Sequence, residues 1–210
     1  MKDSEFISFP EDLRQCIHFH GHLCPGLIYG YRVAKEALRL MGSERAHDEE
    51  IVAIAENDSC AVDALQVILG TTAGKGNLIV RDYGKNAFVI ADRKSARAIR
   101  FSRKTHYTYG GENPSEYADL ESKLVAGNMT EEEENRRKYL KSMDLLTGEF
   151  SAIFETEHIA MPDLPYAPLA PSVPCSLCGE MTMATKLIDR GTEGKCCIPC
   201  VGKTRLPQER

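Results

Sequence analysis

The sequence predicts an α+β core domain followed by a small cysteine-rich module, and three observations carry this prediction. Helix-like and strand-like segments alternate irregularly through the first 161 residues, which favours α+β over a doubly wound α/β sheet. Prolines then stand at every third position from 162 to 174. Five of the eight cysteines follow between Cys175 and Cys200. We therefore expect a core domain over residues 1–161, a proline-rich linker over 162–174 and the module over 175–210.

The first half of the core domain has clear helix and strand signals. A proline at the first position and a glycine just past the end favour a helix over Pro25–Met41. The apolar run Ile51–Ala55 is typical of a buried strand. A second helix is expected over Cys60–Leu69, because Asn57–Ser59 offers capping side chains and a glycine follows.

Further along the core, the pattern changes to that of strands. The segments Asn77–Asp82 and Asn86–Ala91 flank the turn residues Tyr83–Lys85, and this arrangement predicts a β-hairpin. Another strand is expected over Ala96–Phe101.

A last helix is expected in the core domain. Thr130 and Glu133 have the spacing of a capping box, which predicts a helix that runs to about Leu146. The acidic run Glu131–Glu134 is then a helix start favoured by the helix dipole rather than a metal-binding patch.

The proline-rich linker has the repeat of a polyproline II helix, which has three residues per turn. At about 3.1 Å per residue, the segment 162–174 would span roughly 40 Å. It is either an ordinary proline-rich linker or a strut that sets the distance of the module. We expect the module to dock on a core domain, in the same chain or in a partner.

Composition excludes several classes of protein. Hydrophobic residues make up 42% of the chain and charged residues 27%, as in ordinary globular proteins. A formal net charge of −5 argues against a general electrostatic partnership with nucleic acid. The polar N-terminal stretch is unlike a signal peptide, and no apolar run approaches the roughly 20 residues of a membrane span. We expect a cytoplasmic protein, in which cysteines serve as metal ligands or reactive thiols rather than disulfide partners.

The C-terminal module has the spacing of a zinc site. Cys175 and Cys178 form one C-x-x-C pair, and Cys197 and Cys200 form a second pair after an 18-residue interval. Zinc favours four thiolates in a tetrahedron, and such pairs turn both sulfurs onto one ion. A short hairpin is expected between the pairs, over Thr182–Leu187 and Gly191–Lys195, with a helix near the second pair. This order resembles a treble-clef zinc finger.

Two questions about the module stay open. Cys196 is a spare thiol, and an exchange of Cys196 for Cys197 as ligand remains possible on spacing alone. From Cys175 to Arg210 there are six Lys or Arg residues against four Asp or Glu residues. This small excess of positive charge is weak support for a phosphate-binding surface, so we expect a structural or partner-docking role for the module.

A second cluster of metal-binding side chains lies early in the core domain. His18, His20, His22 and Cys24 fall within seven residues, and imidazole with thiolate suits zinc and related metals. Cys24 and Cys60 each stand at a predicted helix N-terminus, where the helix dipole should lower the pKa of a thiol. The cluster is an open divalent-metal site, with His20, His22 and Cys60 as ligands, or a reactive thiol pair, or a group of hydrogen-bonded structural residues.

Residues near the cluster are candidates for substrate binding. Asp63 and Gln66 lie one and two turns beyond Cys60 and can line the same cleft. Lys75 lies in a glycine-rich loop and can meet an anionic substrate group, although a plain turn explains the loop equally well. This loop lacks the arrangement of a P-loop. The polar loop Lys104–Gly111 either borders the cleft or is surface.

Three ordered blocks carry a resemblance to a known family: Gly21–Gly26, Cys60–Gln66 and Gly70–Leu78. They resemble proteins related to FmdE, a component of formylmethanofuran dehydrogenase, which together make up the FmdE-related family. The resemblance covers roughly residues 10–160 and the tail, since some members have a C-terminal treble-clef finger. It implies an α+β core, dimers, and a metal or active site at His20, His22, Cys24 and Cys60.

The resemblance also guides the expected function. It implies a metal-binding accessory to one-carbon, methanogenesis-type metabolism, partnered by a molybdenum or tungsten formylmethanofuran dehydrogenase-type complex. We expect zinc in the finger, a second divalent metal in the core, and a homodimer. Two alternatives stay open: an enzyme that uses Cys24 or Cys60 as thiolate or metal-dependent catalyst, and an adaptor whose finger binds protein or nucleic acid.

Overall fold

The structure, a computed structural model, describes residues 8–202. Residues 1–7 and 203–210, the outer ends of the predicted core domain and module, lie outside this part. The chain divides into two compact units, Met1–Tyr166 and Ala167–Arg210. The first combines helices with a five-stranded sheet, and the second has two small two-stranded sheets. The predicted α+β core with a small cysteine-rich module is confirmed.

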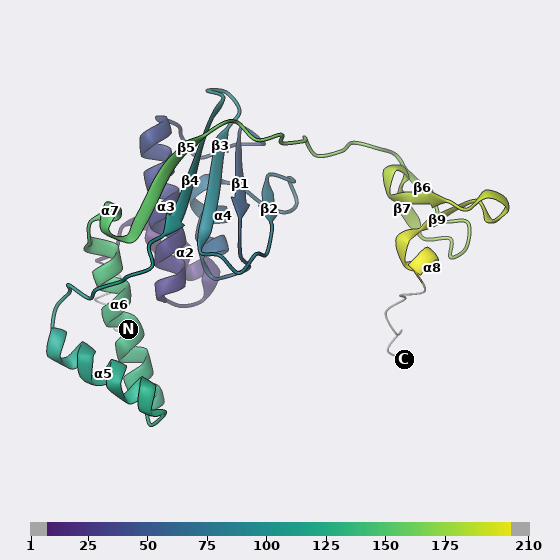
Figure 1. The fold of residues 1–210 in the computed structure, drawn as a ribbon. Helices are drawn as coiled ribbons and strands as arrows, with labels where there is room; N and C mark the ends of the chain where they lie inside the picture. Colours follow the sequence, from purple (N-terminus) through teal and green to yellow (C-terminus); the bar gives the residue numbers. More distant parts are fainter. Residues whose placement is uncertain (1–7, 203–210) are drawn as a thin grey trace. The chain divides into compact units, whose positions relative to one another are not determined.

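A five-stranded sheet forms the centre of the first unit (Figure 1), with strand order β2-β1-β3-β4-β5. Only the β1–β2 pair is parallel; the others are antiparallel. The strands are β1 Ile51–Ala55, β2 Leu78–Val80, β3 Ala87–Asp92, β4 Arg97–Arg103 and β5 Phe154–Ile159.

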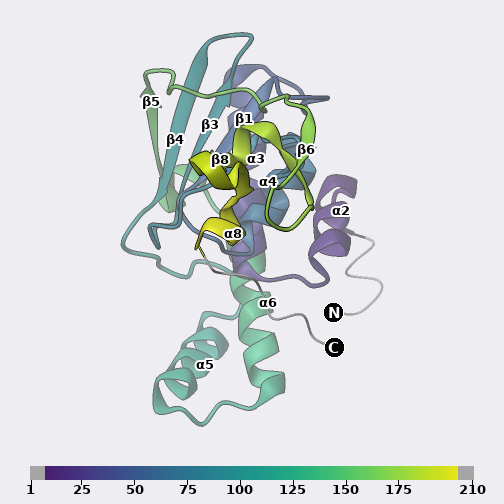
Figure 2. The same cartoon turned by 90° about the vertical axis from the view of Figure 1, so that its right-hand side faces the viewer.

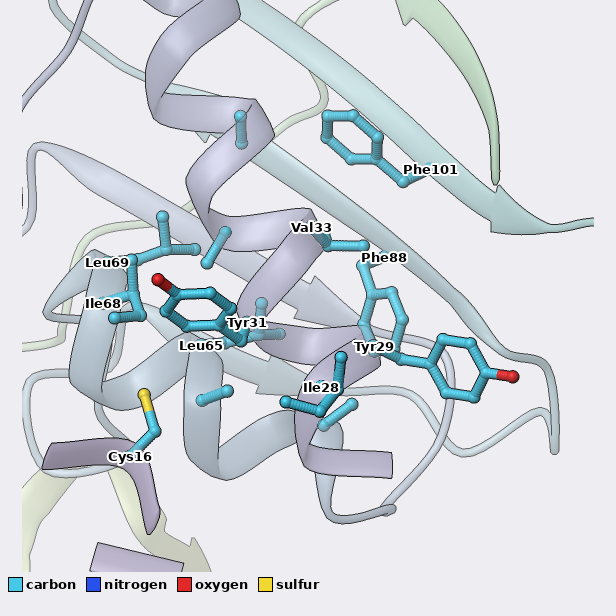
Figure 3. Close-up of a cluster of buried hydrophobic side chains, with 14 of the residues drawn as sticks. Cys16, Ile28, Tyr29, Tyr31, Val33, Leu65, Ile68, Leu69, Phe88 and Phe101 are labelled. Atoms are coloured by element: carbon cyan, nitrogen blue, oxygen red, sulfur yellow. The ribbon is translucent and has the colours of Figure 1, made fainter. Parts of the chain in front are cut away.

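Three helices cover one face of this sheet, as Figures 1 and 2 show. They are α2 Glu11–His20, α3 Pro25–Met41 and α4 Ala61–Leu69. Side chains from α3, α4 and the facing strands meet in the main hydrophobic core (Figure 3). Phe88 on β3 and Phe101 on β4 are among the largest buried side chains there, and Val89 and Ala98 of the same two strands belong to the cluster on the opposite face. This period-two alternation is what a sheet with two buried faces requires.

Helices α3 and α6 begin and end where the sequence predicts. Pro25 opens α3, and Gly42 ends it in a left-handed conformation with φ 62°. Helix α6, Glu131–Thr147, starts with a complete capping box between Thr130 and Glu133. Helix α4 begins one residue later than predicted, with Cys60 at its N-cap.

The predicted β-hairpin is wrong, although both of its strands exist. Strand β2 does not pair with β3; β1 lies between them and pairs with both. The turn amides of Tyr83 and Lys85 donate to the carbonyl of Glu56, so the connection wraps around the end of β1. Since β1 is buried along its whole length, it takes the sheet interior, and the more exposed β2 takes the edge.

Several elements have no counterpart in the sequence prediction. They are α2, the edge strand β5, the short helix α7 Phe150–Ile153 and the helix α5 Pro114–Ala126. Helices α5 and α6 form a hairpin that extends beyond the sheet (Figure 2). Arg32 of α3 fixes the end of α6, because its guanidinium donates to the carbonyls of Leu145, Leu146 and Gly148.

The proline-rich segment is divided between the two units. Leu164 is buried against the open face of the sheet, and Arg93 donates to the carbonyls of Leu164 and Pro165. Its guanidinium also lies 3.9 Å from the ring centre of Tyr166. At the other end, β6 Ser172–Pro174 already belongs to a sheet of the second unit. The residues between Tyr166 and Ser172 therefore form a connection shorter than the linker expected over the segment 162–174.

The second unit is built from short elements. They are β6, β7 Met181–Met183, a 3-10 turn at Ala184–Lys186, β8 Leu187–Asp189, a 3-10 turn at Gly191–Glu193, β9 Lys195–Cys197 and α8 Ile198–Gly202. Strands β8 and β9 form the hairpin between the cysteine pairs, a few residues later than predicted. The order of knuckle, hairpin and helix at the second cysteine pair agrees with the predicted zinc-finger arrangement.

None of the helices within residues 8–202 is long and apolar enough to cross a membrane.

Candidate metal centres

The four cysteines of the second unit converge on one point. The sulfurs of Cys175, Cys178, Cys197 and Cys200 all lie within 4.8 Å of one another. The first pair lies in a tight turn, because the amide of Gly179 donates to the carbonyl of Cys175 and Gly179 has φ 75°. The second pair spans the end of β9 and the start of α8. Four sulfurs in this arrangement can hold a metal ion.

The adjacent thiols of Cys196 and Cys197 lie in different surroundings. Successive side chains of a strand point to opposite sides, and Cys196 and Cys197 both lie on β9. Cys197 lies 3.8 Å from the sulfur of Cys178. The Cys196 thiol instead donates to the carbonyls of Glu193 and Gly194.

Backbone amides favour a thiolate within this cluster. The amide of Cys197 donates to the sulfur of Cys175 at 3.2 Å. This bond and the amides of Cys178 and Leu177 lower the pKa of Cys175 to about 6. Metals bind the thiolate form of cysteine, so these amides favour the form of Cys175 that can bind a metal.

The second cluster lies where α2 ends and α3 begins. One ring nitrogen each of His20 and His22, together with the sulfur of Cys24, lie within 4.8 Å of one another. Helix α2 ends at His20, and Gly21 in the left-handed region, with φ 93°, turns the chain. The segment is therefore not extended, and the turn returns His22 and Cys24 to His20.

His18, the first histidine of the motif, is not part of this cluster. It lies on α2 and lines a separate surface cavity with Glu11, Arg14 and Phe19.

The two histidines of the cluster lie close together: His20 and His22 have ring centres 4.5 Å apart. Burial, then the charges of His20 and Lys138, lowers the pKa of His22.

Asp63 touches the cluster through His20. Its Oδ2 lies 2.7 Å from His20 Nδ1, and Gln66 donates to Oδ1 at 3.3 Å. The other ring nitrogen of His20, Nε2, lies 3.7 Å from the sulfur of Cys24. An aspartate on one nitrogen and the cluster on the other is the arrangement that orients metal-bound histidines.

Cys24 and Cys60 lie together, but the predicted fall in thiol pKa is wrong for Cys24. Cys24 is the N-cap of α3, and its sulfur accepts from the amide of Leu27. Burial nevertheless outweighs this bond and raises the pKa of Cys24, and the Cys60 thiol raises it further. Both sulfurs lie beside Gly26, where a Cβ would be 3.5 Å from that of Cys60 and 3.8 Å from that of Cys24.

Lys75 is not brought to this cluster. Its ammonium donates to the carbonyls of His47 and Asp48, and its loop follows the C-terminal end of α4, whereas Cys60 is at the N-terminal end. The loop Lys104–Gly111 lines other hollows: Tyr109 to Gly111 border a cavity of about 580 Å³ with Asp144.

The sequence motifs identified side chains that cluster in the structure but not all of their neighbours. The role of Asp63 beside His20 depends on the packing of α2 against α4, which no local pattern encodes. Lys138 on α6 is placed near His22 in the same way, through a helix far along the chain.

The sequence of this chain is similar to that of a curated protein. The chain is 30% identical over 200 residues to a protein of Archaeoglobus fulgidus described as a probable S-adenosyl-L-methionine-binding protein. That match covers 88% of this chain and 50% of the relative, so the chain spans about half the length of the curated relative it matches.

A solved structure shares the fold. It is a tungsten formylmethanofuran dehydrogenase FmdE-like protein from Syntrophus aciditrophicus, with a TM-score of 0.60. The similarity covers 96% of this chain and 97% of that one, at 21% identity.

The family model described as FmdE, molybdenum formylmethanofuran dehydrogenase operon, matches residues 19–157. The match takes in the His20, His22 and Cys24 cluster together with Cys60 and Asp63, and it ends before the four-cysteine module. Because it spans well over half of the sequence, this chain belongs to the FmdE family.

Proposed function

We propose that this FmdE-family protein holds two metal ions: zinc at Cys175, Cys178, Cys197 and Cys200, and a second divalent transition metal at His20, His22 and Cys24. The observation that carries the proposal is the presence of two clusters, each with its ligand atoms within 4.8 Å. The first is a structural centre, and the second is the functional one.

The zinc proposal rests on the donor set of the finger. Four thiolates saturate a tetrahedral ion and leave no position for substrate, as in structural zinc sites. The unit around it buries little apart from the cysteines themselves. Its folding should therefore depend on the ion.

The core cluster has the donor set of an open site. Two imidazoles and one thiolate suit zinc, nickel or a similar ion, and three protein ligands leave a position for another molecule. The proposed set takes Cys24 in place of Cys60 of the predicted set, because the Cys24 sulfur lies within 4.8 Å of both imidazoles. Cys60 lies beside Cys24 as a neighbouring sulfur. A metal bound there would supply Lewis-acid chemistry toward a small ligand.

Metal binding explains the thiols better than nucleophilic catalysis does. A thiol nucleophile needs a lowered pKa, and burial raises that of Cys24. A buried sulfur beside two imidazoles is consistent with a ligand that loses its proton when the metal binds.

The wider role follows from the family. We propose an accessory to a formylmethanofuran dehydrogenase-type system, acting as a homodimer in the cytoplasm. The support is the family description and the eight cysteines, none of which forms a disulfide in the described structure, as suits a reducing compartment. Mass in solution and co-purification with such a complex test these two points.

Cobalt(II) titration tests the core metal directly. With the finger already filled by zinc, added cobalt should give the thiolate-to-metal absorption of a mixed nitrogen and sulfur site. His22→Ala should lose this absorption, whereas His18→Ala, a histidine outside the cluster, should keep it. Identical spectra for both variants, or no absorption in the unaltered protein, would refute the core site.

A further inference from the structure

Two cations near the core cluster lie outside the ion pairs of the described residues. Arg103 ends β4 and Lys141 lies on α6, and neither forms an ion pair within residues 8–202. Both instead lie against aromatic rings. The Arg103 guanidinium is 5.2 Å from the ring centre of Tyr29, and the Lys141 ammonium is 4.7 Å from that of Tyr107.

The acids in this region are already engaged. Glu121 accepts from Arg137, and Asp144 accepts from the Tyr107 hydroxyl and from the amide of Gly110. Burial, followed by the nearby charges of Arg103 and Arg137, lowers the pKa of Lys141 despite the attraction of Glu121. Asp144 keeps its negative charge, because both of its donors are neutral, and it acts on Tyr29 together with Arg103. Two cations, Arg103 and Lys141, thus face this one carboxylate, which leaves the region with a net positive charge.

A buried hydroxyl lies at the same place. Tyr29 is 7% exposed, and its hydroxyl has no hydrogen-bond partner in the described structure. In Figure 3 it points away from the aliphatic side chains that surround Tyr31 and Leu65. Burial raises the pKa of Tyr29, so the hydroxyl keeps its proton and remains a donor. An unpaired buried donor costs free energy that a ligand can recover.

This donor and these cations lie at the end of the sheet that carries the core cluster. Ala55, Phe88 and Phe101 form one row across β1, β3 and β4. Arg103 lies two residues beyond that row, at the end from which β1 leads to Cys60. On α3, Gly26 touches Cys60, and Tyr29 follows one turn later, about 5 Å along the helix.

We propose that Arg103, Lys141 and the Tyr29 hydroxyl form an oxyanion-binding subsite beside the His/Cys cluster. It would take the carboxylate or phosphate of a small ligand, since guanidinium and ammonium groups bind both and the hydroxyl supplies a further donor. An extended acidic ligand could place its other end at the core cluster. The subsite needs no metal to bind an anion, so it can be tested separately from the proposed metal centre.

Thermal stabilisation of the full chain by inorganic phosphate and by acetate tests the subsite. A ligand that binds the folded state alone raises the melting temperature, and sodium chloride at matched ionic strength sets the baseline. The unaltered protein should gain stability above this baseline from at least one anion. A preference for phosphate or for acetate identifies the ligand class.

Variants then locate the binding. Tyr29→Phe keeps the ring and removes only the hydroxyl, so it should keep the fold while weakening the anion affinity roughly tenfold. Arg103→Gln with Lys141→Gln should abolish the effect, whereas Arg39→Gln, an exposed cation already paired with Glu36, should not change it. The proposal would be overturned if phosphate and acetate raised the melting temperature no more than sodium chloride does, or if their effect were unchanged in Tyr29→Phe.

Discussion

His20 is held in the core cluster through the ring nitrogen that faces away from it. Its Nδ1 meets Asp63, and Asp63 is in turn fixed by Gln66. If Nδ1 carries the proton and donates it to the carboxylate, Nε2 is left with a lone pair on the side of Cys24. The contact thus selects the tautomer that can bind a metal, and it orients the ring. We therefore propose that Asp63 positions His20; its predicted part in substrate binding stays a prediction.

Asp63→Asn tests this role at the scale of one residue. The amide cannot stabilise the Nδ1 proton as a carboxylate does, so affinity for the core metal should fall by about 10–100-fold. Competition against a chelator measures the affinity, and the imidazole nitrogen NMR shifts report the tautomer. The exposed Asp58→Asn serves as the matched control, and zinc in the finger should be unaffected. Unchanged affinity and tautomer in Asp63→Asn would remove Asp63 from the metal site.

Close contact between α3 and α4 holds the two core thiols together at the scale of elements. A Cβ on Gly30 would lie 2.1 Å from the carbonyl oxygen of Ala61. Only a glycine lets the helix backbones approach this far. The approach places Cys60, at the start of α4, beside Cys24, at the start of α3.

Gly30→Ala should therefore damage both stability and the site. The contact is with backbone, so the helices must separate, at a cost of about 1–3 kcal/mol or more. The midpoint of urea unfolding measures the stability, and cobalt titration measures the core site. Gly74→Ala is the control, because nothing lies within 4 Å of a Cβ there. Equal stability of the two variants would show that the helices do not depend on this contact.

The capping box of α6 predicts a specific dependence on pH. The Lys123 ammonium, then the amide of Thr130, lowers the pKa of Glu133 to about 2. A carboxylate with a depressed pKa stabilises the folded state above its unfolded pKa of about 4.5, and this contribution disappears as the pH falls through about 2.

Glu133→Gln should accordingly be less stable than the unaltered protein above about pH 5, and the difference should shrink toward pH 2. Urea midpoints across this range measure it. Glu132→Gln, in the same helical turn, is the matched control. A stability difference that stays constant down to pH 2 would contradict the role of the Glu133 charge.

Local signals predicted some elements and missed others for physical reasons. Helix α3 has a proline start and a glycine end, and α6 has a capping box, so each carries its own boundaries in sequence. Strand pairing depends on distant partners, which is why the hairpin of β2 and β3 was wrong: β1 takes the place between them. Strand β5 was missed because it is mostly exposed and lacks an apolar pattern.

In the candidate sites too, local spacing predicted some features, whereas others depend on tertiary packing. The four-cysteine cluster could be predicted, because its spacing alone brings the ligands together. The core motif predicted His20, His22 and Cys24 as a group. It could not predict that burial raises the pKa of Cys24, or that Asp63 meets His20, because both depend on tertiary packing.

The whole molecule consists of two units with different sources of stability. The first unit has an extensive hydrophobic core between α2, α3, α4 and the sheet. The second buries mainly its cysteines, Cys175, Cys196 and Cys197 among them. We therefore expect a unit of this size and composition to need a metal to stay folded.

Chelation of the full chain should therefore unfold one unit and spare the other. Removing metal should expose residues 172–202 to protease and to hydrogen exchange, while β1 and β3 stay protected. Adding zinc back should restore the finger. Protection of residues 172–202 that survives complete metal removal would mean that the finger folds without its ion.

Metal content per chain tests the central claim of two separate centres most directly. Anaerobically purified full-length protein, loaded with metal and freed of excess, should contain about two ions by elemental analysis. Cys178→Ala should retain about one, in the core, and His22→Ala should retain about one, as zinc in the finger. A single ion in the unaltered protein, or loss of both ions from either variant, would contradict the claim.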